Sequence, residues 1–189
     1  DIEKFKFNPI EERTSILFIG NLVKAKGVYE LIHAFHDISK FFNVNLIIIG
    51  DGNAKSELIY YAKKHQLTKH ISFLGWKKQD DLINYYQRAK MLCLPSYQEG
   101  TPNVVMEALS CGTPIVGSNI DGIAEIVTNE NGILCQPKSH VDLAEKLKQA
   151  LYKTWNYKNI RKYAVDELNS LAQIKKINNI YKTCLNQFN

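Results

Sequence analysis

The sequence lacks several features that would assign it directly to a class of protein. No run of apolar residues approaches the ~18 that a membrane-spanning helix needs. The first residues, DIEKFKFNPIEERTS, contain neither the basic region nor the apolar core of a signal peptide. An initiator methionine is also absent, and we expect the chain to be a piece of a longer protein. "GDG" at 50–52 is not a G-x-G-x-x-G motif, which argues against a dinucleotide-dependent dehydrogenase.

Cysteine is scarce and is not arranged for bridges or metals. The four cysteines are Cys93, Cys111, Cys135 and Cys184. None of them forms a C-x-x-C pair, and Cys93 and Cys135 lie inside apolar runs. We therefore expect buried free thiols in a reducing, cytoplasmic compartment, and neither a disulfide framework nor a zinc site.

Few of the basic residues are arginine. The net charge is +5, yet only three of the 24 basic residues are arginine, and the lysines are scattered among acidic residues. Arginine makes the bidentate contacts to bases and phosphates that nucleic-acid-binding proteins favour. A solvated, lysine-rich surface explains the charge, and we expect no nucleic-acid partner. With 189 residues, of which 45% are hydrophobic, the chain can bury a core as one domain or two small ones.

Short β-branched runs alternate along the chain with longer amphipathic stretches. The expected strands are 15–20, 44–50, 70–75, 91–96, 113–118 and 132–137, and the expected helices include 28–42, 55–65 and 79–89. From residue 139 on the pattern is helical, with Ser139 as a candidate N-cap. This alternation predicts an α/β fold: a Rossmann-like parallel sheet of about six strands with helices on both faces. Its ligands should bind in the loops after the strands.

The expected organisation has three parts. Residues 1–14 should be an incoming interdomain linker, residues 15–168 the α/β domain, and residues 169–189 a C-terminal helix that packs back across the domain. No internal repeat or low-complexity segment interrupts this division.

The stretch "PSYQEGTPNVVMEALSCGTPIV" (95–116) holds the strongest candidate site. Thr101 is a candidate N-cap and Pro102 a candidate first helical residue, so a helix should begin near 102. A helix N-terminus at this edge of a parallel sheet favours an anion such as phosphate. Glu107, one turn inside, would repel phosphate, so its expected partners are hydroxyls such as those of ribose. Glu99 in the loop could meet the hydroxyls of a second sugar-like group.

On spacing alone a plainer interpretation stays open. Glu99 is equally compatible with an exposed loop acid, and Glu107 with an acid on the helix surface or in a salt bridge.

In its context, this stretch resembles the E-x7-E signature of the retaining, GT-B-fold glycosyltransferases of family 4. The resemblance continues in order through FIGNLVKAKGVYELIHAF, IIGDGNAKSEL, ISFLGWKKQDDLINYYQRAKMLCLPS and DGIAEIVTNENGILCQP, over about residues 16–150. It implies that the chain is the C-terminal, donor-binding half of a two-domain enzyme whose missing N-terminal half holds the acceptor. Such an enzyme transfers a hexose-type sugar, with retention, from a nucleotide-diphospho-sugar (UDP- or GDP-linked) to a glycan or lipid-linked acceptor. It would use no metal and no cofactor.

The resemblance also implies roles for single residues. Lys26 matches the lysine that clamps the donor diphosphate, Glu99 the glutamate that contacts the donor sugar and supports the transition state, and Glu107 the glutamate that binds ribose. Asn21 stands where the family usually has arginine, so the clamp is weaker here or relies on Lys24.

Further positions match segments that act through their backbone. The segment whose N–H groups hold sugar and phosphate corresponds to Gly100, Thr101, Pro102, Asn103 and Val104. Trp76 and Lys78 align with the segment that meets the base, where Trp76 could stack on the base or simply pack. The isolated domain should bind nucleotide weakly and transfer nothing.

Two alternative functions and one alternative site, a metal site, remain open from the sequence. A non-catalytic nucleotide-sugar or glycan-binding module could keep the fold, and Asn21 favours it mildly, whereas a GT-B nucleotide-sugar epimerase would want an acid/base pair that the sequence does not offer. His33 and His36 lie three residues apart beside Asp37, but no third ligand is placed by sequence, so we interpret them as surface histidines. The expected setting is capsular or other cell-surface polysaccharide biosynthesis, in the cytoplasm or at the inner face of the membrane.

Overall fold

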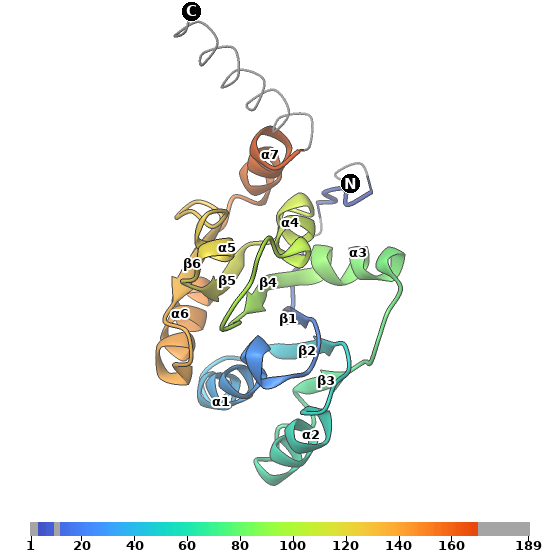
Figure 1. Cartoon of the computed structure of the whole chain (residues 1–189), viewed down its shortest axis with the longest axis vertical. Helices are drawn as coiled ribbons and strands as arrows, with labels where there is room; N and C mark the ends of the chain where they lie inside the picture. The colour runs from blue at the N-terminus through green and yellow to red at the C-terminus, as the bar shows by residue number, and fades with distance from the viewer. Residues whose placement is uncertain (1–3, 10–11, 170–189) are drawn as a thin grey trace, which may run out of the picture.

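The computed structural model of the chain describes residues 4–9 and 12–169 (Figure 1). The strands are β1 (Ser15–Ile19), β2 (Asn45–Ile49), β3 (Ile71–Phe73), β4 (Ala89–Leu94), β5 (Ile115–Ser118) and β6 (Gly132–Cys135). The helices are η1 (Lys24–Lys26), a 3-10 turn, and α1 (Val28–Ile38), α2 (Lys55–Lys64), α3 (Gln79–Arg88), α4 (Asn103–Ser110), α5 (Asp121–Ala124), α6 (His140–Tyr152) and α7 (Tyr157–Glu167).

The six strands form one parallel sheet in the order β3-β2-β1-β4-β5-β6. β1 lies in the middle, where Leu17 is opposite Ile47 of β2 and Leu92 of β4. All five residues of β1 are buried, which is typical of a parallel strand covered on both faces. From β1, the sheet extends through β2 and β3 on one side and through β4, β5 and β6 on the other. The loops after β1 and β4 therefore lie at the point where the strand order reverses, the usual ligand site of such sheets.

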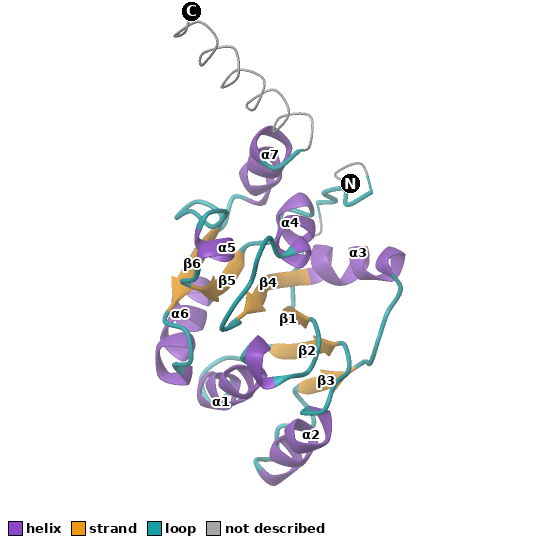
Figure 2. Cartoon of the chain, viewed as in Figure 1, coloured by secondary structure: helices purple, strands orange, loops and turns teal. Residues whose placement is uncertain are grey.

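Helices cover both faces of this sheet. α1 packs against α6 and α2, whereas α4 packs against α3 and α7. Figure 2 shows α1 and α6 on one side of the strands and α3, α4 and α7 on the other. The predicted six-stranded α/β architecture is confirmed.

Two predicted helix ends can be compared directly with the structure. The predicted apolar stripe of α1 is buried throughout, but the helix ends at Ile38 and not at 42, and Phe41 beyond it is 74% exposed. The Ser39 hydroxyl donates to the His36 carbonyl oxygen at 3.0 Å at this helix end. At α6 the predicted cap is confirmed, because Ser139 Oγ accepts a hydrogen bond from the Asp142 N–H at 3.2 Å.

The segment before β1 packs onto the domain. Phe5 is buried with its ring 5.9 Å from that of Tyr86, and its carbonyl oxygen accepts from Arg161. Arg13 is buried as well, and its guanidinium donates to the Ala89 carbonyl oxygen at 2.9 Å. The described part of the expected linker is therefore anchored to the domain, while its boundary at residue 14 stays a prediction.

The expected C-terminal helix over 169–189 lies almost wholly outside the described residues, as does Cys184. Cys93, Cys111 and Cys135 are buried free thiols, as predicted. Burial raises the pKa of Cys111 to about 12 and that of Cys135 to about 11, so neither thiol supplies a nucleophilic thiolate near neutral pH. Over the described ranges, no helix is long and apolar enough to cross a membrane.

Candidate functional site

The loop after β1 is held in a tight turn that carries Lys26. Gly27, which follows η1, has φ +65, and a Cβ there would lie 2.0 Å from the carbonyl oxygen of Pro95. Only glycine combines this left-handed conformation with such a close approach. The Tyr97 N–H then donates to the Ala25 carbonyl oxygen at 2.8 Å. These two contacts bind the loop after β1 to the loop after β4.

Lys26 and Glu99 meet across this junction. The distance between Lys26 Nζ and Glu99 Oε1 is 2.7 Å, and the Ser96 hydroxyl donates to the same oxygen at 2.6 Å. The Glu99 side chain is 11% exposed and that of Lys26 is 29% exposed, so the ion pair is only partly screened by water. The structure thus brings together the two residues predicted to be catalytic, which are 73 positions apart in the sequence.

The N-terminus of α4 follows directly after Glu99. The helix begins at Asn103, and the capping position is occupied by Pro102, not by Thr101 as predicted. Pro102 has φ −75 and ψ 107, an extended conformation, and no side chain caps the helix. The Val105 and Met106 N–H groups donate to the Pro102 carbonyl oxygen, which leaves the N–H groups of Asn103 and Val104 in the first turn available to an anion. The predicted helix is present and begins one residue later than expected, while anion binding at its N-terminus stays a prediction.

Gly100 and Gly122 shape the loop in different ways. A Cβ on Gly122 would lie 1.5 Å from the carbonyl oxygen of Gly100, so α5 packs directly against the loop. A Cβ on Gly100 would have no atom within 4 Å. The missing side chain of Gly100 therefore leaves open space beside Glu99, where a ligand could approach the backbone.

Glu107 is held by helix α3. The Tyr86 hydroxyl donates to Glu107 Oε2 at 2.7 Å, and the Gln79 side-chain amide donates to Oε1 at 2.9 Å. Tyr86 is fully buried, and burial, followed by the charge of Glu107, raises its pKa well above the ordinary value. Tyr86 therefore remains a hydrogen-bond donor. The salt-bridge alternative for Glu107 is not what the structure shows, since both partners are neutral.

Three residues that hold these glutamates were not singled out by the sequence. Ser96 could have been found, because it lies three residues before Glu99 in the same loop. Gln79 and Tyr86 are seven residues apart and so lie on one face of α3, but nothing in the sequence says that this face meets α4.

The remaining candidates are not joined to this cluster. Asn21, Trp76 and Lys78 are exposed, with Trp76 at 65%. Within the described part of the chain, no side-chain hydrogen bond or ion pair links Asn21 or Lys78 to Lys26, Glu99 or Glu107. Trp76 is not packed in the core of the described residues, and stacking of its ring on a base stays a prediction.

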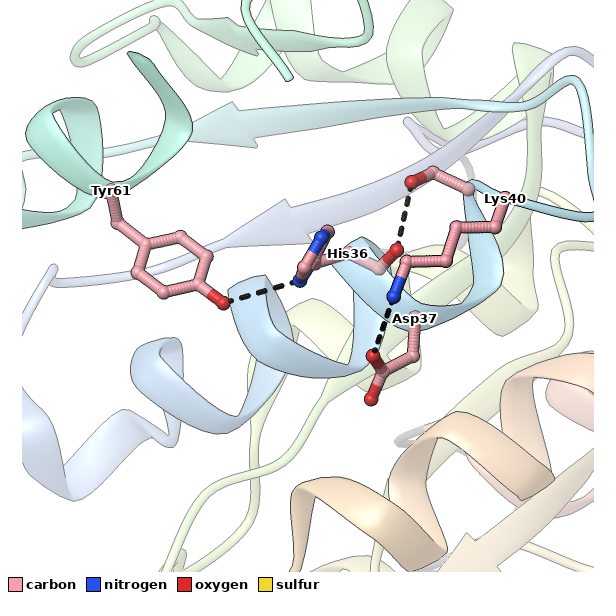
Figure 3. Close-up of polar contacts among 5 residues, drawn as sticks. His36, Asp37, Lys40 and Tyr61 are labelled. Carbon is pink, nitrogen blue, oxygen red and sulfur yellow. Dashed lines mark hydrogen bonds and ion pairs between the residues drawn. The ribbon is translucent and has the colours of Figure 1, made fainter. Parts of the chain in front are cut away.

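His36 of α1 faces Tyr61 of α2 (Figure 3), and both α1 histidines are partly buried. The Tyr61 hydroxyl is 3.4 Å from His36 Nδ1, and the His33 ring stacks on Tyr61 with centroids 4.6 Å apart. Asp37 pairs with Lys40 at 3.5 Å instead of approaching an imidazole as a ligand partner. Among the described residues, no three His, Cys, Asp or Glu side chains come together as a metal site would require.

Comparisons with known proteins identify the family of the chain. The sequence matches the family described as glycosyl transferases group 1 over residues 1–166. An uncharacterized glycosyltransferase of Methanocaldococcus jannaschii is 32% identical over 181 residues, which are 93% of this chain and 46% of that relative. The capsular polysaccharide biosynthesis glycosyltransferase CapM of Staphylococcus aureus is 29% identical over 98% of this chain and 53% of its own length. The chain spans about half the length of these curated relatives.

Solved structures show the same fold at lower identity. The C-terminal domain of the glycosyl transferase group 1 protein LpcC from Francisella tularensis is similar with a TM-score of 0.79 and 21% identity, over 90% of this chain and 98% of that one. Anabaena HepE in complex with UDP has a TM-score of 0.82 and 21% identity, over 97% of this chain and 55% of HepE. The fold is that of GT-B glycosyltransferase C-terminal domains. With the family match over residues 1–166, the chain belongs to the glycosyl transferases group 1 family.

Proposed function

We propose that this chain is the donor-binding half of a retaining glycosyltransferase of the E-x7-E type. It would bind a UDP- or GDP-linked hexose and act with a preceding acceptor-binding half on a glycan or lipid-linked acceptor. The observation that carries this proposal is the meeting of Lys26 and Glu99 beside the N-terminus of α4, with Glu107 one turn further along the same helix.

Lys26 and the α4 N-terminus would bind the donor diphosphate. The ammonium charge and the N–H groups of Asn103 and Val104 both favour the negative charge that grows on the leaving nucleoside diphosphate. Lys26 now pairs with Glu99, and Ser96 keeps a second hydrogen bond to the same carboxylate oxygen. A bound diphosphate could therefore share Lys26 while Glu99 accepts a hydrogen bond from a sugar hydroxyl.

Glu107 would accept hydrogen bonds from the ribose. Its carboxylate has about four lone-pair sites, and Tyr86 and Gln79 each donate to one oxygen. These two donors fix the orientation of the carboxylate and leave acceptor capacity for hydroxyls. Trp76, exposed before α3, would provide a stacking surface for the base.

In the proposed reaction, the bond between the anomeric carbon and the phosphate oxygen breaks, and a bond to the acceptor hydroxyl oxygen forms on the same face of the sugar. The hydroxyl proton passes to the departing phosphate oxygen, so no separate base or metal is needed. The residues of this chain would position the donor and stabilise the leaving group. The resemblance to CapM supports a setting in capsular or other surface polysaccharide synthesis, in the cytoplasm or at the inner membrane face.

Calorimetric titration with UDP, GDP, ADP and their hexose conjugates tests the proposal. We expect saturable binding of one nucleotide, lost in Lys26→Ala and in Glu107→Ala. Lys148→Ala is a matched control, because Lys148 pairs with Glu145 at 2.6 Å and is 30% exposed, much as Lys26 pairs with Glu99. That variant should bind as the parent does. Absence of binding at millimolar nucleotide, both in this chain and in a longer protein that includes the preceding half, would contradict the proposal.

A further inference from the structure

A pocket borders the two loops that carry Lys26 and Glu99. Its volume is about 540 Å³, and it is lined by Lys24, Tyr29, Glu30, Asn53, Glu57 and Tyr97. Lys24 lies in the same turn as Lys26, and Tyr97 lies in the same loop as Glu99. The hydrogen bond between the Tyr97 N–H and the Ala25 carbonyl oxygen joins these two segments. A molecule in this pocket would therefore lie next to the donor site.

Two tyrosine–glutamate pairs line the pocket. The Tyr97 hydroxyl donates to Glu30 Oε1 at 2.7 Å, and the Tyr29 hydroxyl donates to Glu57 Oε2 at 2.6 Å. Burial, together with the hydrogen bond to Glu30, raises the pKa of Tyr97 to about 12, so its hydroxyl stays protonated. Each pair fixes one carboxylate oxygen and leaves the other for a different donor.

Glu30 has a buried oxygen without a partner. Oε2 is inaccessible to solvent, and no hydrogen bond reaches it from any described residue. A buried carboxylate oxygen without a donor is costly, whereas a donor supplied by a ligand or an ordered water removes that cost. Glu30 thus keeps an unused acceptor, which a ligand hydroxyl would reach once a rotation of the side chain turns Oε2 toward the pocket.

The charges of the lining select against phosphate. Glu30 and Glu57 outnumber Lys24, so the pocket carries a net negative charge, in contrast to the lysine and helix end that face the donor site. Carboxylates accept from hydroxyls, Asn53 and Lys24 can donate to ring or hydroxyl oxygens, and the rings of Tyr29 and Tyr97 offer apolar surface to the C–H groups of a pyranose. A neutral, polyhydroxylated sugar matches this combination.

We propose that this pocket is a saccharide subsite that holds a pyranose of the acceptor glycan beside the donor. The inference rests on the proposed glycosyl transfer and adds a place for the acceptor on this half of the enzyme. The other source of the same chemistry is the sugar of the donor itself, and the test separates the two.

The test is saturation-transfer NMR of the chain with the methyl α-pyranosides of glucose, galactose, mannose and N-acetylglucosamine at millimolar concentration. At least one glycoside should give a saturable signal that persists when UDP is added. The signal should weaken about tenfold in Glu30→Gln, because the neutral amide loses a charged acceptor. It should weaken in Tyr97→Phe as well, since Glu30 then loses its orienting donor. Glu145→Gln, an exposed acid on α6, is the matched control and should leave the signal unchanged.

Three outcomes would overturn the subsite. The first is the absence of a saturable glycoside signal in the parent chain. The second is a signal that a UDP-hexose abolishes and that is equally strong in the parent and in Glu30→Gln. The third is a loss of signal in Glu145→Gln as large as that in Glu30→Gln. Circular dichroism and melting of each variant report its folding, and Glu57→Gln repeats the test on the second pair. Nucleotide titration of Glu30→Gln separates this inference from the proposed function, because UDP or GDP affinity should not change.

Discussion

Glu99 and Glu107 are eight residues apart, yet their surroundings differ in kind. Glu99 pairs with a lysine and a serine from loops at the edge of the sheet. Glu107 accepts from a glutamine and from a fully buried tyrosine of the neighbouring helix α3. A charged partner in a loop can be exchanged for a charged ligand, whereas a buried neutral donor depends on its acceptor. Under the proposed function, Glu99 would mainly serve binding, and Glu107 would serve both binding and stability.

The largest effect should come from breaking the junction on the Glu99 side. Gly27→Ala combines an unfavourable φ of +65 with a Cβ placed 2.0 Å from the Pro95 carbonyl oxygen. The free energy of unfolding should fall by about 2–4 kcal/mol, measured by urea denaturation. Gly75→Ala is the matched control, since Gly75 has φ +64 but nothing within 4 Å of the added Cβ. Equal losses in the two variants would show that the close approach to Pro95 contributes nothing.

Glu107→Ala should be the next in size. The buried Tyr86 hydroxyl loses its acceptor, which should lower the free energy of unfolding by about 1–3 kcal/mol. In a Tyr86→Phe background no hydroxyl is left unpaired, so the same substitution should cost much less. A double-mutant cycle by denaturation measures this coupling. Strictly additive losses would mean that Glu107 does not support Tyr86.

Lys26→Met should separate binding from stability. The ion pair is only partly buried and Ser96 still donates to Glu99, so the free energy of unfolding should change by less than about 1 kcal/mol. Nucleotide affinity should fall about tenfold or more, because a charge-assisted contact to the diphosphate is lost. Calorimetry and denaturation on the same sample provide both values. A large loss of stability with unchanged affinity would show that the Lys26–Glu99 pair serves stability and not binding.

The smallest effect should arise far from both glutamates, in the histidines between α1 and α2. Burial lowers the pKa of His33 and of His36 below the ordinary 6.5. The unfolded chain therefore binds more protons than the folded chain as pH falls below about 6.5, and stability decreases. Denaturation midpoints at about pH 7.5 and about pH 5.5 should differ less in His33→Gln/His36→Gln than in the parent. An unchanged difference would show that other groups cause the pH dependence.

Much of the fold was predictable because the hydrophobic pattern and strand propensity are local properties of the sequence. Six apolar runs became six strands, and the buried stripe of α1 followed its helical spacing. The Ser139 cap was also local, since its hydroxyl bonds an N–H only three residues away. The Thr101 cap failed because Pro102 is extended and takes the capping position itself, so the helix starts one residue later.

The partners of the site residues were less predictable. The sequence identified Lys26, Glu99 and Glu107 through a family resemblance, but it did not identify Tyr86, Gln79 or the Tyr97–Glu30 pair. These contacts join segments from 21 to 67 positions apart, whose neighbourhood depends on how the helices pack. Hydrophobic periodicity reports which face of a helix is buried, but not which neighbour that face meets.

By itself, the sequence determined the alternation of strands and helices, the residues in each loop and the family to which the chain belongs. The tertiary structure decided which of those loops meet. Lys26 reaches Glu99 because β4 pairs with β1 on the side opposite β2, and the order β3-β2-β1-β4-β5-β6 is not encoded in the period of any strand. Strand order is decided by long-range pairing and by how helices cover the two faces, and these interactions exist only once the whole domain has packed.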